Sequence, residues 1–366
     1  MPQVGDLRAK MSSLLEALDK WLCRPITVME VCGTHTVSIF RSGIRTMLPE
    51  GVRLLSGPGC PVCVTDQAEV DAMVRLAKGP GVVLATYGDM VRVPGSCGSL
   101  AEARASGAEV AVVSSAIQAL ALAGSIQDKE IVFAGIGFET TAPATAVLLR
   151  EARSKNVKNL SVLSLHKLVP PVLRLLASDP MLNIDGFLLP GHVSTIIGTA
   201  PYAFLAEEYG KACAVAGFEP LDIMAGIVEI ARQICEGRPA VRRLYGRVVR
   251  HEGNVKAQEL LEEVFRPASV RWRGIGLVEA SGLVLANDYS DFDAYSRFGI
   301  TLEEVSPPAG CRCGDVLAGR ITPPECPLFG RSCTPQFPVG PCMVSSEGSC
   351  SAYYRYSSKG VSPWGA

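Results

Sequence analysis

The chain has 366 residues, which is enough for two or three domains of ordinary size. Hydrophobic residues make up 48% of it, so a sizeable core can form and the composition is not that of a disordered chain. Because 35 basic residues are balanced by 36 acidic ones, the chain carries no electrostatic footprint for nucleic acid or for an anionic membrane.

The N-terminal segment is typical of an amphipathic helix and not of a signal peptide. Charged residues within 6–10 precede the sequence MSSLLEALDKWL (11–22), whose leucines fall on one face. The longest uncharged run, 110–127, contains several Ser and Gln residues, and a buried strand followed by a helix explains it better than a membrane span. We therefore expect a cytoplasmic protein without a membrane-spanning segment.

Seven short apolar runs alternate with helix-like stretches between residues 25 and 200. Each run is rich in Val, Ile and Leu and mostly uninterrupted, as are the strands of a parallel sheet that is covered on both faces. The alternation predicts an α/β fold of the doubly wound type. The runs span residues 26–31, 52–56, 81–86, 109–114, 130–135, 160–165 and 186–190.

Residues that could carry chemistry follow six of these runs directly. In an open α/β sheet the loops at the carboxyl ends of the strands converge on one crevice, so we expect a single shared site although its parts are far apart in the sequence. The segments are CGTHT (32–36), GPGCPVC (57–63), YGD (87–89), GFETT (137–141), HK (166–167) and GHVS (191–194).

A faint internal repeat accompanies these motifs. VCGTHT followed by LLSGPG in the first half resembles IGFETT followed by LLPGH in the second half. Two related α/β halves would produce this echo, and chance similarity between glycine-rich strand ends explains it about equally well.

Beyond residue 200 the character of the sequence changes twice. Residues 200–300 are expected to be largely helical, and from Ser306 the chain turns to Pro, Gly and Cys with hardly any periodicity. Such a tail buries little apolar area by itself, so we expect a covalent or metallic group to hold it. We place the domains at about 1–120, 121–225 and 226–366.

Six of the 13 cysteines fall between Cys311 and Cys350. An odd count without a secretory signal argues against a disulfide framework and for thiol, metal or redox chemistry. Four thiolates on a loop-rich segment suit zinc or a [4Fe–4S] cluster, and wide spacing without a tight zinc knuckle favours the cluster. The interval series C-x12-C-x6-C-x16-C selects Cys313, Cys326, Cys333 and Cys350.

Cys60 and Cys63 form a C-x-x-C motif directly after the second run. In such motifs one thiol has a lowered pKa and attacks, and the other resolves the mixed disulfide. A redox pair, half of a metal site and a tight structural turn all remain open for this motif.

Five further side chains are candidates for the same crevice. Cys32 and His35 follow the first run, and a thiolate with an imidazole suits iron, zinc or a nucleophilic pair. Glu139 offers a carboxylate and His192 an imidazole at later strand ends, as does His166. Each single histidine could equally fill a structural role in the core.

Taken together, the motifs resemble those of the hydrogenase maturation factor HypD family. CGTHT, GPGCPVCV, GFETTAP, PGHVS and the tail pattern CRCGDVL…CPLFG…C…CMVSSEGSC match its signature blocks in order, over about residues 20–356. The resemblance implies two doubly wound α/β domains with parallel sheets around a central cleft, followed by a C-terminal iron–sulfur region of loops and helices.

The resemblance also implies a function. Members of this family are cytosolic scaffolds on which, with the small chaperone HypC, the Fe(CN)2CO group of [NiFe]-hydrogenases is assembled before it passes to the hydrogenase large subunit. HypE, working with HypF, supplies the cyanide. Whether a thiol-redox step makes such a scaffold an enzyme is left open.

Carried over by position, Cys32 would be the thiol nearest the mononuclear iron. Cys60 and Cys63 would be iron ligands or a redox dithiol, with His35, Glu139 and His192 beside them. The cluster would be held by the four cysteines of the interval series, and Cys311 and Cys342 receive no role.

Two other functions are compatible with the sequence. One is a thiol–disulfide oxidoreductase whose cluster reduces a partner through the C-x-x-C motif. The other is a zinc-stabilised binding module without redox chemistry. Metal analysis would separate this module from the scaffold and from the oxidoreductase.

Overall fold

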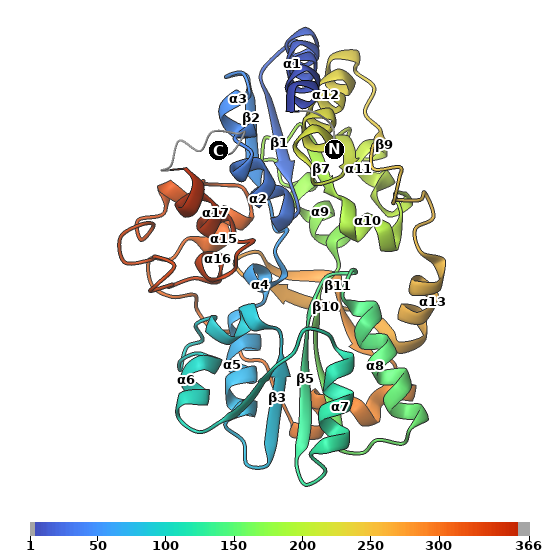
Figure 1. Ribbon diagram of the computed structural model, residues 1–366, viewed down its shortest axis with the longest axis vertical. Coiled ribbons are helices and arrows are strands. Elements are labelled where there is room, and N and C mark those ends of the chain that lie inside the picture. Colours follow the sequence, from blue (N-terminus) through green and yellow to red (C-terminus); the bar gives the residue numbers. More distant parts are fainter. Residues whose placement is uncertain (1–3, 358–366) are drawn as a thin grey trace.

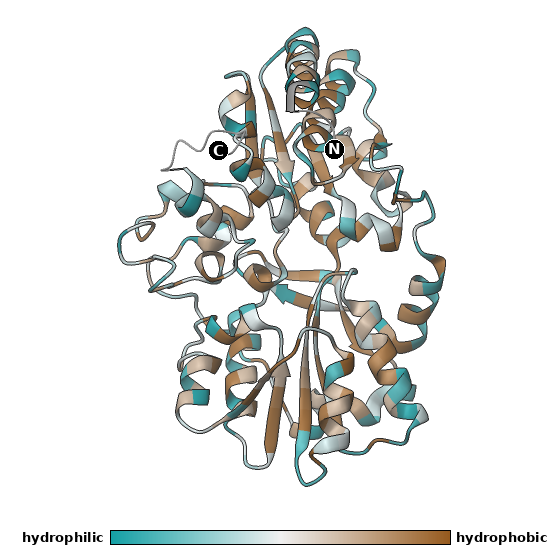
Figure 2. Cartoon of the chain, viewed as in Figure 1, coloured by the Kyte–Doolittle hydropathy of each residue, from teal (hydrophilic) through white to brown (hydrophobic). Residues whose placement is uncertain are grey.

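A computed structural model of the chain describes residues 4–357. It contains two parallel β-sheets in separate lobes, with an antiparallel hairpin between them and the C-terminal segment alongside the lobe that holds the N-terminus (Figure 1). Strands in both lobes are coloured as apolar and the polar residues gather on the outer helices, as expected for sheets covered on both faces (Figure 2).

The first lobe is built on a five-stranded parallel sheet in the order β2-β1-β7-β8-β9. Helices α1 (Val4–Trp21) and α12 (Pro220–Glu236) pack against each other and cover one face (Figure 1). The strands are β1 (Ile26–Glu30), β2 (Val52–Ser56), β7 (Gly186–Pro190), β8 (Ala212–Ala216) and β9 (Val241–Arg243).

The second lobe holds a four-stranded parallel sheet in the order β4-β3-β5-β6. One face packs against α5 (Gln67–Ala77) and α6 (Leu100–Ala105), and the other against α7 (Ile117–Ser125) and α8 (Ala142–Ser154). The strands are β3 (Val82–Thr86), β4 (Glu109–Val112), β5 (Glu130–Gly137) and β6 (Leu160–His166).

The hairpin consists of β10 (Phe265–Trp272) and β11 (Gly276–Leu285). It contacts β6 of the second lobe and helix α9 (Val169–Ser178), and therefore bridges the lobes. The remaining α-helices are α2 (Gly33–Arg41), α3 (Ile44–Met47), α4 (Pro61–Val64), α10 (Gly191–Ile197), α11 (Ala203–Glu207), α13 (Val255–Val264), α14 (Ala294–Phe298), α15 (Cys313–Leu317), α16 (Pro341–Val344) and α17 (Ser349–Tyr356). Short 3-10 turns cover Gly88–Arg92, Ala200–Tyr202, Asn287–Phe292 and Pro323–Glu325.

The doubly wound α/β prediction is confirmed, and each of the seven apolar runs forms a strand. The N-terminal helix is confirmed as α1, and residues 110–127 form the end of β4 followed by α7. Across residues 4–357, none of the helices combines the length and apolar character that crossing a membrane requires.

The expectation that residues 200–300 are largely helical is wrong. Helices α12 and α13 lie there, but so do β8, β9 and the whole β10–β11 hairpin. The sequence of β8, ACAVA, consists mostly of alanine and carries little strand propensity, so only its place between β7 and β9 makes it a strand.

The strand pairing does not follow the expected boundary near residue 120. Strands β1 and β2 pair within one sheet with β7, which lies about 130 residues further along the chain, whereas β3 and β4 pair with β5 and β6. Where independent folding units begin and end stays a prediction.

Both sheets share one winding order. In each sheet the first strand in the chain lies between the second and the third strand of that sheet. In the first lobe β1 lies between β2 and β7, and in the second lobe β3 lies between β4 and β5. This order equates β7 with β5, and therefore GHVS with GFETT. The sequence echo had instead paired CGTHT with GFETT.

The cysteine-rich tail contributes to the core, contrary to expectation. Cys313, Leu317, Met343 and Val344 are buried in the largest hydrophobic cluster. Helix α17 lies against α2, where the rings of Phe40 and Tyr353 have centroids 4.4 Å apart. Apolar burial therefore contributes to holding the tail against the first lobe.

Candidate functional site

Cys32 lies where β1 ends and α2 begins. It occupies the N-cap position of α2, is 8% exposed, and follows the buried carboxyl group of Glu30. One oxygen of Glu30 accepts the backbone N–H of Cys32 at 3.2 Å, and the other accepts the hydroxyl of Thr36 at 2.5 Å. The two hydrogen bonds to the Glu30 carboxyl group therefore fix the backbone that carries the Cys32 thiol.

The C-x-x-C motif caps the short helix α4 after the neighbouring strand β2. Cys60 is its N-cap, Pro61 starts the helix with a suitable φ, and the Cys63 N–H donates to the Cys60 sulfur at 3.3 Å. The two thiols therefore point to the same side of one turn.

Glycine brings these two loops into contact. The N–H of Gly33 donates to the carbonyl of Gly59 at 2.9 Å. A Cβ on Gly59 would lie 2.2 Å from the nitrogen of Cys32, so no other residue fits there without moving the loop. Cys32 and Cys60 thus sit on adjacent loops at one sheet edge, as the strand register predicted.

Cys342, which received no role from the sequence, joins the C-x-x-C motif to the tail. Helix α16 packs on α4, and the Cys342 thiol lies near enough to the thiols of Cys63 and Cys350 to influence their pKa values. Its sulfur also lies 2.7 Å from the sulfur of Cys313. A continuous row of thiols runs from Cys60 through Cys63 and Cys342 to Cys313.

These thiols differ in acidity. Burial raises the pKa of Cys32 to about 12 and that of Cys60 well above its ordinary value. Burial opposes ionisation of Cys63 as well, but hydrogen bonds from the Cys342 and Cys60 thiols and the positive charge of Arg273 lower its pKa to about 6. Cys63 is therefore the nucleophilic member of the pair at neutral pH.

The remaining tail cysteines lie close to this row. Cys311 neighbours Cys313, Cys326 and Cys333, whose charges help raise its pKa to about 12. The described residues include no group of three or more His, Cys, Asp or Glu side chains spaced to hold a metal ion. The donor chemistry fits an iron–sulfur cluster, since these are buried or half-buried thiols on a segment of loops and short helices.

A cavity of about 740 Å³ opens beside Cys60, between the lobes. Its walls come from α4, from the carboxyl ends of β3, β4 and β5, and from the tail after α16. Loops from both sheets therefore meet at this cavity, and of the site residues predicted from the sequence Cys60 lines it. Residues that line it include Cys60, Tyr87, Asp89, Ser114, Thr141 and Glu347.

The other predicted site residues are placed differently. The ring of His192 stacks on Phe218 at 3.9 Å and lies near enough to Glu347 for its charge to act on the imidazole. The Nε2 of His35 bonds the carbonyl of Gly217 at 2.9 Å, and burial lowers the pKa of this histidine to about 4. His35 thus anchors α2 from within the core.

Glu139 and His166 face the interior of the protein. Glu139 accepts the backbone N–H of Val169 at 2.9 Å, and burial raises its pKa to about 7. His166 is hydrogen-bonded to Thr145 at 2.9 Å and packs edge-on against Phe265. For His166 the structural role left open by the sequence is the one observed.

Sequence reasoning missed Glu347, which contacts the Cys32 loop from the tail. Its carboxylate accepts the Thr34 hydroxyl at 2.7 Å, and a Cβ on Gly33 would lie 2.6 Å from the Glu347 Cβ. Ser345, two residues earlier, donates to Asp89 at 3.0 Å. Glu347 and Ser345 lie between tail cysteines, and only that proximity in sequence could have indicated them.

The fold and the site define a class. This is a two-lobed α/β protein in which cysteines from three separate chain segments lie close together, and one of them, Cys60, lines the cleft. The chain belongs to the HypD family of hydrogenase maturation factors: the family profile described as "Hydrogenase formation hypA family" matches residues 8–357.

Relatives of the chain match it over nearly the full length. The chain is 45% identical to hydrogenase maturation factor HypD of Escherichia coli over 357 residues, which is 97% of this chain and 95% of the relative. It is 43% identical to HypD of Rhodobacter capsulatus, covering 96% and 94%. A putative hydrogenase expression/formation protein of Methanocaldococcus jannaschii is 44% identical, covering 95% of each chain.

Proposed function

We propose that this protein is the cytosolic scaffold on which, together with HypC, the Fe(CN)2CO group of a [NiFe]-hydrogenase is assembled. In this proposal HypE, with HypF, delivers the cyanide, and the finished group passes to the hydrogenase large subunit. The iron group is cargo, held by the chain only until transfer.

One observation carries the proposal: cysteines from three chain segments lie on loops and short helices that contact one another beside the cleft. Cys32 comes from the loop after β1, Cys60 and Cys63 from the loop after β2, and Cys342 from the tail. Low-spin Fe(II) with cyanide and CO is a soft centre that thiolates bind well. Cys32, whose backbone is fixed by Glu30, is the thiol assigned to the iron.

The Cys60–Cys63 pair serves the iron as ligands or as a redox switch, and the row of thiols favours the switch. If Cys313 and Cys342 form a disulfide, the Cys63 thiolate attacks the Cys342 sulfur and Cys313 leaves as thiolate. Cys60 then displaces Cys342, which closes a Cys60–Cys63 disulfide and leaves Cys313 and Cys342 reduced. Two electrons and two protons pass from one pair to the other.

The tail cysteines would hold a [4Fe–4S] cluster, which when bound and reduced would supply electrons one at a time to a neighbouring disulfide. The interval series assigns Cys313, Cys326, Cys333 and Cys350 as its ligands. A Cys313 that forms a disulfide with Cys342, whose sulfur lies 2.7 Å away, does not bind the cluster at the same time, so the thiol path requires Cys311 as the fourth ligand.

Infrared spectroscopy tests the proposal. We expect the complex with HypC, purified without oxygen, to show iron–cyanide and iron–CO stretching bands, and Cys32→Ala to abolish them. Cys235→Ala is the matched control because its thiol is exposed on α12, away from the cleft. Bands of undiminished intensity in Cys32→Ala refute the role assigned to this thiol.

The contact between Cys63 and Cys342 favours one second function, a cluster-dependent thiol–disulfide oxidoreductase that acts on a partner protein. Iron analysis separates the two. The scaffold carries mononuclear iron in addition to the four irons of a [4Fe–4S] cluster, whereas the oxidoreductase carries only the four cluster irons.

A further inference from the structure

The tip of the β10–β11 hairpin lies between the two thiol-bearing segments of the site. Residues Arg273–Ile275 connect the strands. On one side the tip contacts the chain directly after Cys63, and on the other it contacts helix α15, which begins at Cys313. None of these hairpin residues belongs to a motif that the sequence singled out.

Arg273 makes the contact with the C-x-x-C side. It is 4% exposed, and its backbone N–H donates to the carbonyl of Val64 at 3.0 Å. Its Nε donates to the carbonyl of Thr65 at 2.7 Å and its Nη1 to the side-chain oxygen of Gln67 at 2.5 Å. Three bonds therefore fix the segment that follows Cys63, and the planar fork of an arginine is needed to make the last two together.

Gly274 makes the contact with the tail. Its φ is +69°, and a Cβ there would lie 2.1 Å from the Cα of Gly314. A Cβ on Gly314 would in turn lie 2.4 Å from the Cα of Gly274. The two backbones touch one residue away from Cys313, so the hairpin tip fixes the position of that cysteine as well.

The hairpin itself is held firmly at this end. The ring of Trp272 is fully buried, stacks on Phe138 and donates to the Ser281 hydroxyl at 2.9 Å. The buried ammonium of Lys167 donates to the carbonyl of Arg271 at 2.9 Å and pairs with Glu69. The tip is therefore a rigid spacer, anchored in the second lobe.

We propose that the hairpin tip sets the alignment of Cys63 with the Cys313–Cys342 pair, and that Arg273 is the positioning residue of this contact. The inference rests on the thiol path of the proposed function. Arg273 does not exchange electrons or protons in the thiol path. Its guanidinium group, bonded to Thr65 and Gln67, holds the turn that carries Cys63 at the distance at which the Cys63 thiolate can attack Cys342.

The test measures how strongly Cys63 and Cys342 favour a mutual disulfide in the folded full-length chain. In a Cys60→Ser, Cys313→Ser background, oxidised glutathione takes two electrons from the two thiols, giving the Cys63–Cys342 disulfide and two molecules of reduced glutathione. Titration with glutathione buffers, alkylation and peptide mass spectrometry then give the effective concentration of one thiol relative to the other.

We expect Arg273→Gln to lower this effective concentration at least tenfold. Arg273→Lys should show the same loss, because an ammonium keeps the charge but cannot make the fork to Thr65 and Gln67. Arg271→Gln is the matched control: this neighbour on β10 pairs with Glu304 at the surface, and its loss should change nothing.

Two results overturn the inference. An effective concentration unchanged in Arg273→Gln shows that the fork does not align the thiols, and full recovery in Arg273→Lys shows that charge, not alignment, is what Arg273 supplies. If Arg273→Gln does not fold, Gln67→Leu removes a single bond of the fork and should lower the value about threefold, whereas no change in this variant refutes the role. Since no iron or partner is present, failure of the scaffold proposal leaves this result standing, and failure here leaves the infrared test intact.

Discussion

Glu139 shows how burial alone sets the behaviour of one residue. Its carboxyl group is 2% exposed, one oxygen accepts the Val169 N–H, and the other has no hydrogen-bond partner among the described residues. A carboxylate in such a place is poorly solvated, which is why its pKa is raised to about 7. Tyr202, whose pKa the Glu139 charge helps to raise, is the titratable neighbour.

This shift predicts a specific pH dependence of stability. The folded pKa lies above the unfolded one, so the protonated carboxyl stabilises the protein fully below about pH 4.5 and this contribution is lost as the pH rises to about 7. Relative to Glu139→Gln, which keeps the Val169 bond, the wild type should lose about 3 kcal/mol over that range. Urea unfolding at several pH values measures the difference.

The comparison is internally controlled. Glu30 has a similarly raised pKa, but it is present in both proteins and cancels in the difference. Parallel stability curves for the two proteins from pH 5 to pH 8 would show that the Glu139 carboxyl is not shifted.

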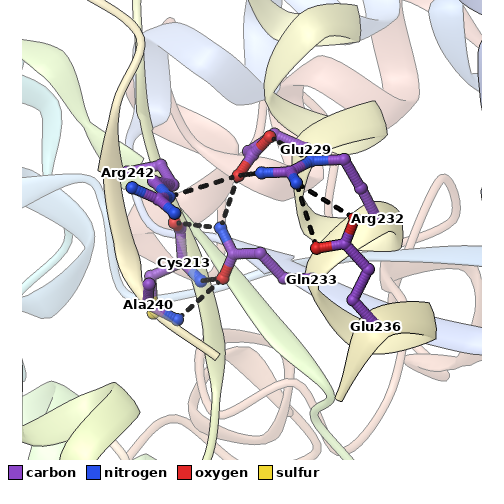
Figure 3. Close-up of polar contacts among 7 residues, drawn as sticks. All are labelled: Cys213, Glu229, Arg232, Gln233, Glu236, Ala240 and Arg242. Carbon is purple, nitrogen blue, oxygen red and sulfur yellow. Dashed lines mark hydrogen bonds and ion pairs between the residues drawn. The ribbon is translucent and has the colours of Figure 1, made fainter. Parts of the chain in front are cut away.

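At the scale of elements, the side chain of Gln233 joins α12 to the edge of the first sheet by hydrogen bonds (Figure 3). Its side-chain oxygen accepts the backbone N–H groups of Cys213 on β8 and Ala240 before β9, at 3.3 and 2.9 Å. Its nitrogen donates to the Cys213 carbonyl at 3.2 Å. One buried amide thereby bonds backbone groups of two segments and ties both to α12.

Gln233→Ala should therefore destabilise the protein by about 2–4 kcal/mol, because it removes three hydrogen bonds to backbone groups and opens a cavity. The neighbouring Arg232→Ala is the control. It removes only partly exposed ion pairs with Glu229 and Glu236 and should cost less than about 1 kcal/mol. Chemical denaturation measures both values, and equal losses would refute the role given to Gln233.

The elements that could be predicted are those whose sequence carries its own signal. The run GFLLP and the six others read as buried strands because both faces of each are apolar. The strand ACAVA and the hairpin strand FRPASVRW could not be found, since the first has weak propensity and the second alternates polar residues along a half-exposed face. Their conformations depend on neighbours that are distant in sequence.

At the scale of the whole molecule, the tail closes the site because it contacts loops of both lobes. We expect the anaerobically purified protein to absorb in the iron–sulfur region, and Cys326→Ser or Cys333→Ser to abolish the absorbance. Comparison of Cys311→Ser with Cys313→Ser then identifies the fourth ligand, because only one of the two substitutions should remove the cluster.

Metal content provides the decisive contrast. At least four irons per chain in the wild type, measured by plasma emission spectrometry, accord with the cluster. A colourless protein that contains stoichiometric zinc instead contradicts it and would make the tail a zinc site.

The sequence by itself determined which side chains carry chemistry and that most of them follow strands, because thiol motifs and apolar runs are local signals. It indicated Cys32, Cys60 and Cys63 as parts of one site. Only the tertiary structure decided that Cys342 connects them to the tail and that Arg273 lies beside them. The physical reason is that contact between segments 200 or more residues apart depends on sheet order and on the close approach of glycines, which no local pattern encodes.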